Sequence, residues 1–90
     1  MAEPKNPRPL DEVKDLYTRG LYLQAYERFR PFGPFAEIRD TDALLMAGRL
    51  ANNLGSSRLA AALHRRAFRK DPGHAEARYF YAYTLLTLRG

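Results

Sequence analysis

Glycines at a fixed interval constrain the fold of this 90-residue chain more than any other feature. Gly20, Gly55 and Gly90 lie 35 residues apart, and each follows a stretch with the apolar spacing of a helix. Ala25 and Ala60 repeat the same interval. A period of about 34 residues that contains two helices is typical of helical repeat proteins, in which each unit buries its apolar face by stacking on the next.

The sequence indicates five helical segments, and no segment alternates apolar and polar residues as a half-buried strand would. We expect helices over residues 11–19, 21–30 and 42–54, a fourth from a cap at Ser56 or Ser57 to Lys70, and a fifth over residues 75–88. Pro31 ends the second helix, and Pro72 follows the fourth. Three prolines in the first ten residues predict a flexible N-terminal segment over residues 1–10.

The connection between the second and third helices is rich in apolar residues. Phe32, Phe35 and Ile38 are too apolar to remain in water, so we expect them to close one end of the core. Asp40 and Thr41 follow, and either can cap the N-terminus of the third helix.

The central unit, residues 41–74, resembles a tetratricopeptide repeat. The matching positions are Leu44, Ala47, Gly48 and Ala51 in the first helix, Gly55 in the turn, and Ala60, His64, Ala67 and Pro72 in and after the second helix. Because Gly48 and Ala60 are small, the two antiparallel helices can approach closely. The first unit keeps the pattern only at Leu16, Gly20, Ala25 and Phe29.

The resemblance implies an all-α fold of five helices, with antiparallel helix-turn-helix repeats stacked as a short right-handed solenoid. Its single domain, residues 11–90, would comprise a degenerate repeat over residues 11–40, the best repeat over 41–74 and a half repeat over 75–90. In this family the first helix of each unit lines a concave groove that takes an extended peptide or a helix of a partner protein.

The groove residues that the resemblance implies are Lys14, Tyr17, Leu45, Arg49, Asn52, Tyr79, Tyr83 and Leu86. A simpler interpretation is that they form the ordinary solvated side of each helix. In the central helix, Leu45, Arg49 and Asn52 project opposite an apolar face of Ala43, Ala47, Leu50 and Leu54. In the last helix, the face expected toward the preceding unit consists of Ala77, Tyr81, Leu85 and Leu88.

Some members of the family hold a terminal carboxylate with a clamp of Lys, Asn and Arg. Lys14 and Arg49 are cationic, but Leu10, Met46 and Phe80 occupy positions where such a clamp needs polar or basic groups. We therefore expect no carboxylate clamp of that kind.

The net charge of +5 arises entirely within residues 56–90. Arg58, Arg65 and Arg69 share one face of the fourth helix, and Arg66 and Lys70 lie beside it. This basic stripe could contact phosphates. The favoured interpretation is an exposed face that keeps the chain in solution, because no aromatic residue interleaves the stripe to stack on bases.

The histidines and hydroxyl residues give no catalytic pattern. His64 falls where the repeat usually buries an aromatic ring, so we expect a packed core histidine, and His74 precedes the last helix. No carboxylates or cysteines cluster with them in the sequence, which predicts no metal site. No serine has a recognisable base partner and no glycine-rich phosphate loop occurs, so we expect neither an enzyme nor a cofactor.

The sequence thus predicts a protein-interaction scaffold that binds a peptide or helix of an unidentified partner. One alternative is homo-oligomerisation through the last helix, whose apolar surface also suggests that the chain is the N-terminal part of a longer protein. The other is nucleic-acid association through the Arg58–Lys70 stripe. Without cysteine, a secretory signal or an apolar run of about 20 residues, a cytoplasmic protein with no membrane partner is expected.

Overall fold

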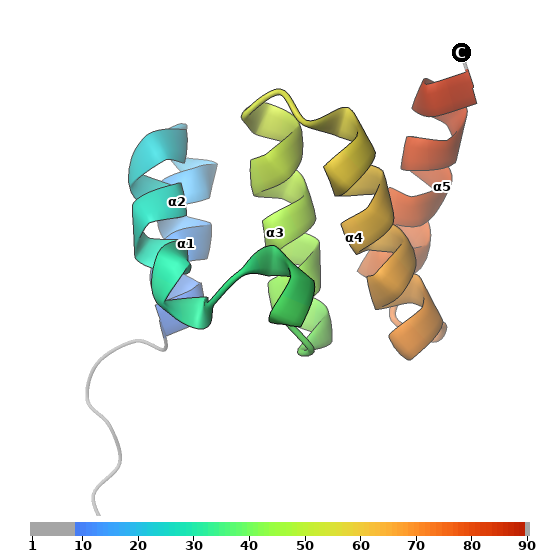
Figure 1. Cartoon of the computed structure of the whole chain (residues 1–90), viewed down its shortest axis with the longest axis horizontal. Helices are drawn as coiled ribbons and strands as arrows, with labels where there is room; N and C mark the ends of the chain where they lie inside the picture. The colour runs from blue at the N-terminus through green and yellow to red at the C-terminus, as the bar shows by residue number, and fades with distance from the viewer. Residues whose placement is uncertain (1–8, 90) are drawn as a thin grey trace, which may run out of the picture.

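The computed structural model describes residues 9–89, with side chains for residues 10–87, and this part of the chain is all-helical. Consecutive helices stand side by side, from α1 and α2 at one end to α5 at the other (Figure 1). The elements are α1 (Pro9–Thr18), α2 (Tyr22–Phe29), the 3-10 helices η1 (Arg30–Phe32) and η2 (Phe35–Glu37), α3 (Thr41–Asn53), α4 (Ser57–Lys70) and α5 (Ala75–Arg89). The predicted all-α class and its five α-helices are confirmed for the described residues.

The helix bounds agree with the sequence prediction to within two residues. The largest difference is at α1, which begins at Pro9 rather than at Asp11. Proline fits the first position of a helix, because its missing N–H would have no partner there and its φ is already helical. The predicted flexible segment is therefore wrong at Pro9 and Leu10, and its remainder, residues 1–8, lies outside the described residues.

The turns after α1 and α3 have the same hydrogen-bonded geometry, 35 residues apart. Gly20 and Gly55 adopt φ of +82° and +92°, where a side chain would be strained. The residue after each glycine donates its N–H to the carbonyl five residues earlier, from Leu21 to Leu16 at 3.0 Å and from Ser56 to Ala51 at 2.8 Å. Both turns are Schellman motifs, which explains why glycine occupies both positions.

The N-terminal caps follow the prediction only at α3. The Asp40 side chain accepts a hydrogen bond from the Ala43 N–H at 3.0 Å, which caps α3 as expected. The predicted serine cap of α4 is wrong, because Ser56 occupies the cap position without a side-chain hydrogen bond and Ser57 is already helical.

The connection between α2 and α3 closes one end of the core, as predicted. Ile38 is buried, and Phe32 and Phe35 pack against the buried cluster. The ring of Phe32 stacks on Phe29 with centroids 4.7 Å apart. The guanidinium of Arg66 on α4 donates hydrogen bonds to the carbonyls of Phe35 at 3.0 Å and Ile38 at 2.6 Å. One side chain of α4 therefore satisfies two carbonyls of this connection.

The central helix α3 is buried on more sides than its sequence pattern indicates. Every residue from Ala43 to Gly48 is buried, including Leu45 at 3% exposure, whereas Leu54 at the end of α3 is 44% exposed. The predicted division into an apolar face containing Leu54 and an open face containing Leu45 is therefore wrong at both residues. The reason is that α2, α4 and α5 all contact α3, so little of its N-terminal half is left open.

The helices α3 and α4 pack closely where Gly48 meets His64. A Cβ atom at Gly48 would lie well inside van der Waals contact with the His64 ring. The His64 ring also contacts α5, where it stacks on Phe80 with centroids 5.3 Å apart. The expectation that the small Gly48 permits close packing of the two helices is confirmed, as is the core position of His64.

The face of α5 that packs on α4 is rotated from the predicted one. Ala77 is buried and Tyr81 stacks on Phe68 at 5.2 Å, as expected of that face. Leu85 is 44% exposed, and Thr84 is buried in its place, because its hydroxyl pairs with the His64 ring at 2.9 Å. The Leu88 side chain lies outside the described residues.

None of the helices in residues 9–89 combines the length and the apolar character that crossing a bilayer requires.

We predict that Gly48→Ala destabilises the fold by about 1–3 kcal/mol, because the added methyl group overlaps the His64 ring. Urea unfolding monitored by circular dichroism measures the change. Gly73→Ala is the matched control, since a Cβ there meets only ordinary contact distances. If the overlap is the cause, Gly48→Ala costs much less in a His64→Ala background. Equal costs in the two backgrounds would contradict this explanation.

We also predict that Arg66→Met lowers the free energy of unfolding by about 2 kcal/mol, because it removes the donor of the Ile38 carbonyl and one of the two donors of the Phe35 carbonyl, which also accepts from the Ile38 N–H. The exposed neighbour Arg65 is the control, and Arg65→Met should change stability by less than about 0.5 kcal/mol. Similar losses for both variants would show that Arg66 does not hold this connection.

Candidate functional site

A pocket of about 530 Å³ opens between α1, α3, α4 and α5. Five of the eight predicted groove residues line it: Tyr17, Arg49, Asn52, Tyr79 and Tyr83. Its remaining lining consists of Ser57, Ala60 and His64 from α4 and Phe80, Thr84 and Thr87 from α5. The structure thus brings residues that are up to 70 positions apart in the sequence around one concavity.

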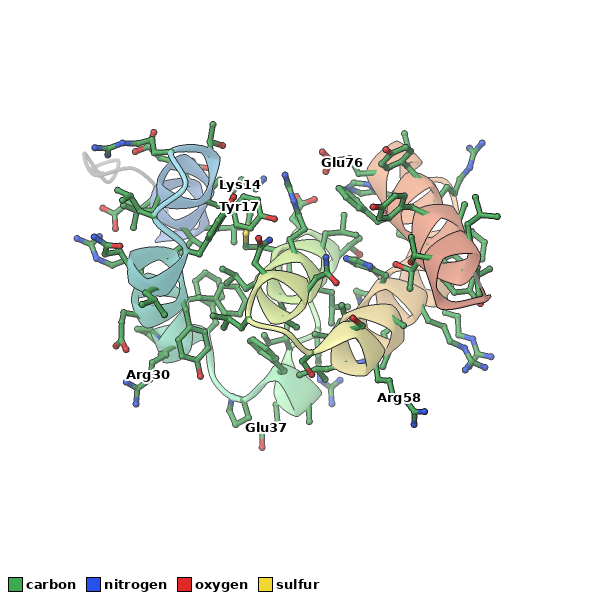
Figure 2. The ribbon with its side chains drawn as sticks, turned by 90° about the horizontal axis from the view of Figure 1, so that it is seen from above. Lys14, Tyr17, Arg30, Glu37, Arg58 and Glu76 are labelled. Carbon is green, nitrogen blue, oxygen red and sulfur yellow. The ribbon has the colours of Figure 1, made fainter. Side chains whose placement is uncertain are left out.

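Three predicted groove residues do not line the pocket. Leu45 is buried in the core, which is a correction to its predicted open position. Leu86 is 72% exposed, and Lys14 is exposed on α1. Lys14, Tyr17 and Glu76 lie on the same side of the molecule in Figure 2.

A continuous stack of side chains crosses the pocket and joins all four helices that surround it. The Arg49 guanidinium lies over the Tyr17 ring at 4.6 Å and over the Phe80 ring at 5.2 Å, and Phe80 stacks on His64 at 5.3 Å. The order is therefore Tyr17 from α1, Arg49 from α3, Phe80 from α5 and His64 from α4. Cation–π contacts of this kind hold a guanidinium plane in a fixed orientation.

Asn53 holds the Tyr17 end of this stack in place. Its side-chain amide donates to the Tyr17 hydroxyl and to the Arg49 carbonyl, the latter at 3.0 Å. The sequence prediction did not include Asn53 or Phe80. Phe80 could have been found from its position three residues before the predicted Tyr83 on the same helix, but the sequence offers no signal for Asn53.

Two tyrosines form an exposed aromatic wall on α5. Tyr79 and Tyr83 are 62% and 52% exposed, and their rings are nearly parallel with centroids 6.4 Å apart. The rings of Tyr79 and Phe80 are nearly perpendicular, with centroids 5.2 Å apart. Rigid, exposed tyrosine surface next to a pocket is typical of sites that bind protein segments.

The buried His64 ring remains neutral near pH 7. Burial lowers the pKa of His64 from 6.5 to about 4, and the nearby positive charge of Arg49 contributes in the same direction. Its Nδ1 pairs with the Thr84 hydroxyl, and its Nε2 is buried with no hydrogen-bond partner among the described residues. Arg49 is therefore the only charged side chain in the described lining of the pocket.

The basic stripe of α4 is separate from this pocket. Arg58, Arg65, Arg69 and Lys70 are exposed, and Figure 2 shows Arg58 on the side of the molecule opposite to Tyr17. Arg66 is a correction to the stripe, because its guanidinium is bound to backbone carbonyls rather than presented to solvent. It forms part of a second concavity of about 680 Å³ together with Arg69 and Lys70.

The structure brings two carboxylates near His74, which the sequence analysis did not expect. One ligand-type atom from each of Asp42, His74 and Glu76 lies within 4.8 Å of the others. His74 Nδ1 accepts from the Ala77 N–H at 3.4 Å, so its Nε2 carries the proton and donates to Asp42 Oδ1 at 2.9 Å. Both carboxylates also lie in the first turns of helices, whose dipoles oppose a cation. This arrangement links α3 to α5 and gives no support for a metal site.

No protein-family model, curated protein or solved structure matches the chain. The resemblance to tetratricopeptide repeats therefore stays a prediction made from the residues. The pocket, with its stacked Arg49 and its tyrosine wall, is the candidate functional site.

We predict that the fold loses stability as the pH falls from 6.5 toward 4. Over this range the unfolded chain protonates His64, whereas the folded protein, with its lowered pKa, does not. The loss should reach about 2 kcal/mol at pH 5, increase further toward pH 4 and be small at pH 7. Urea unfolding at pH 5 and pH 7 measures it. His64→Gln should remove most of the difference between the two values, and an unchanged difference would contradict the assignment.

Proposed function

We propose that this chain is a protein-interaction module of tetratricopeptide-like helix pairs, and that it binds a segment of a partner protein in the pocket between α1, α3 and α5. The observation that carries the proposal is the preformed pocket of about 530 Å³, with an oriented guanidinium and two exposed tyrosines. The module acts by binding and needs no chemical step.

The repeat architecture is supported by features outside the pocket. The two Schellman turns at Gly20 and Gly55 are equivalent and stand 35 residues apart. The helices that follow these turns, α2 and α4, pack on α1 and α3 respectively. Tyr17, Arg49 and Tyr79 belong to α1, α3 and α5, which would be the first helices of successive units and which line the groove in that architecture.

The pocket favours binding because the side chains that would contact a bound segment are already held in place by their neighbours. Asn53 holds Tyr17, and the rings of Tyr17 and Phe80 hold Arg49. Binding therefore costs little additional side-chain entropy at these residues, which is the advantage of a preorganised site. The exposed tyrosine rings supply apolar contact area together with hydroxyl groups.

We predict that peptides selected by this protein bind in the pocket. A library of random 12-residue peptides displayed on phage is selected against the chain, and synthetic versions of the enriched peptides are titrated by isothermal calorimetry. Tyr79→Ala should lower their affinity by about tenfold, because it removes an exposed aromatic contact without disturbing the core. Arg58→Ala, on the opposite side of the molecule, should leave the affinity unchanged.

Two results would contradict this proposal. One is the absence of any enriched peptide that binds in solution. The other is binding that survives Tyr79→Ala but is lost on Arg58→Ala and falls steeply with salt, which would favour the basic stripe instead. A concentration-dependent dimer that Leu86→Glu dissociates would favour self-association, for which the exposed Leu85 and Leu86 are the relevant surface.

A further inference from the structure

Arg49 is a partly buried cation without a charged partner among the described residues. None of the ion pairs within residues 9–89 includes Arg49, and no carboxylate lines the pocket. A guanidinium that has lost part of its hydration gains most when an anion accepts its hydrogen bonds.

The aromatic contacts of Arg49 determine which part of the guanidinium remains available. The Tyr17 and Phe80 rings lie against it at 4.6 and 5.2 Å, so the N–H groups at its edges carry its remaining hydrogen-bonding capacity. A planar guanidinium held in this way can donate two parallel hydrogen bonds to a carboxylate. The same site with Lys would keep the charge but lose both the stacking and the paired donors.

The rest of the pocket fits an anion with a single charge. His64 adds no positive charge near neutral pH, because burial lowers its pKa to about 4. The polar groups of Asn52, Ser57 and Thr87 are neutral. A carboxylate carries one negative charge and matches the single cation of the pocket, whereas a phosphate group carries about −1.5 to −2 and calls for several cations.

The position of Arg49 favours an internal residue of the bound segment over its terminus. Arg49 comes from α3, with Tyr17 of α1 on one side and the tyrosine wall of α5 on the other. A segment that crosses the three helices therefore has residues on both sides of the one that reaches Arg49.

We propose that Arg49 recognises an internal Asp or Glu side chain of the partner segment, while an apolar or aromatic neighbour of that residue packs on Tyr79 and Tyr83. This inference rests on the proposed function of the pocket. It adds the chemistry of the partner, an acidic residue beside an apolar one.

The test uses the same phage library, in which every peptide is joined through its C-terminus to the coat protein and has no free terminal carboxylate. The enriched peptides should share an Asp or Glu next to an apolar or aromatic residue. In C-terminally amidated synthetic peptides, replacing that residue by Asn or Gln should lower the affinity for the wild-type protein by about tenfold. The same replacement should change the affinity for Arg49→Gln by less than about twofold.

Arg65→Gln is the matched control for the change in net charge, because Arg65 is exposed on α4 and does not line the pocket. Acidic peptides should bind Arg65→Gln as tightly as they bind the wild type. Circular dichroism checks that Arg49→Gln is folded. Because the peptide replacement is measured on the wild-type protein, the inference remains testable if that variant does not fold.

Three outcomes would overturn the inference. The first is that the enriched peptides contain no acidic residue. The second is that replacing the acidic residue by its amide changes the affinity for the wild type and for Arg49→Gln equally. The third is much tighter binding of a peptide in its free-acid form than in its amidated form, with no effect of replacing its internal acidic residue, which would indicate recognition of a terminal carboxylate. In each case, loss of binding on Tyr79→Ala would leave the proposed function standing, whereas the absence of any bound peptide would overturn both.

Discussion

The contact between Gly48 and His64 is the constraint on which the rest of the structure depends. Because Gly48 has no side chain, the imidazole of α4 can lie directly against α3. From that position His64 stacks on Phe80 and pairs with Thr84, so it sets where α5 packs. A contact between two helices thereby determines the position of a third, and the pocket lies between them.

The same contact explains the electrostatics of the pocket. A ring at this depth is desolvated, which lowers its pKa and keeps it neutral beside Arg49. Two adjacent positive charges would repel each other, whereas a neutral ring together with Phe80 and Tyr17 supports the guanidinium. The described lining of the pocket thus has a single charge that is held in place by neutral neighbours.

The sequence groups the basic residues of α4 into one stripe, but in the structure they have two different roles. Arg66 turns toward the connection between α2 and α3 and binds two of its carbonyls. Arg58, Arg65 and Arg69 remain in solvent, so most of the positive charge lies outside the pocket. The charge most relevant to recognition is therefore Arg49, a residue outside the basic C-terminal part of the chain.

The sequence by itself determined the helices, because their signals are local. The glycine turns, the Asp40 cap and the prolines act within a few residues, so the bounds of the five helices follow from neighbours in the chain. Five of the pocket residues were also among those that the resemblance to tetratricopeptide repeats implies, once its groove rule was applied at the three- and four-residue spacing of a helix face.

Only the tertiary structure decided which faces are open. Leu45 has the spacing of an exposed residue, but it is buried because three other helices contact α3. Thr84 rather than Leu85 is the packed residue of α5, and its hydroxyl pairs with the buried imidazole of His64 on another helix. The stack of Tyr17, Arg49 and Phe80 likewise joins three helices. Such contacts depend on the distances between helices, and a periodic pattern within one helix carries no information about them.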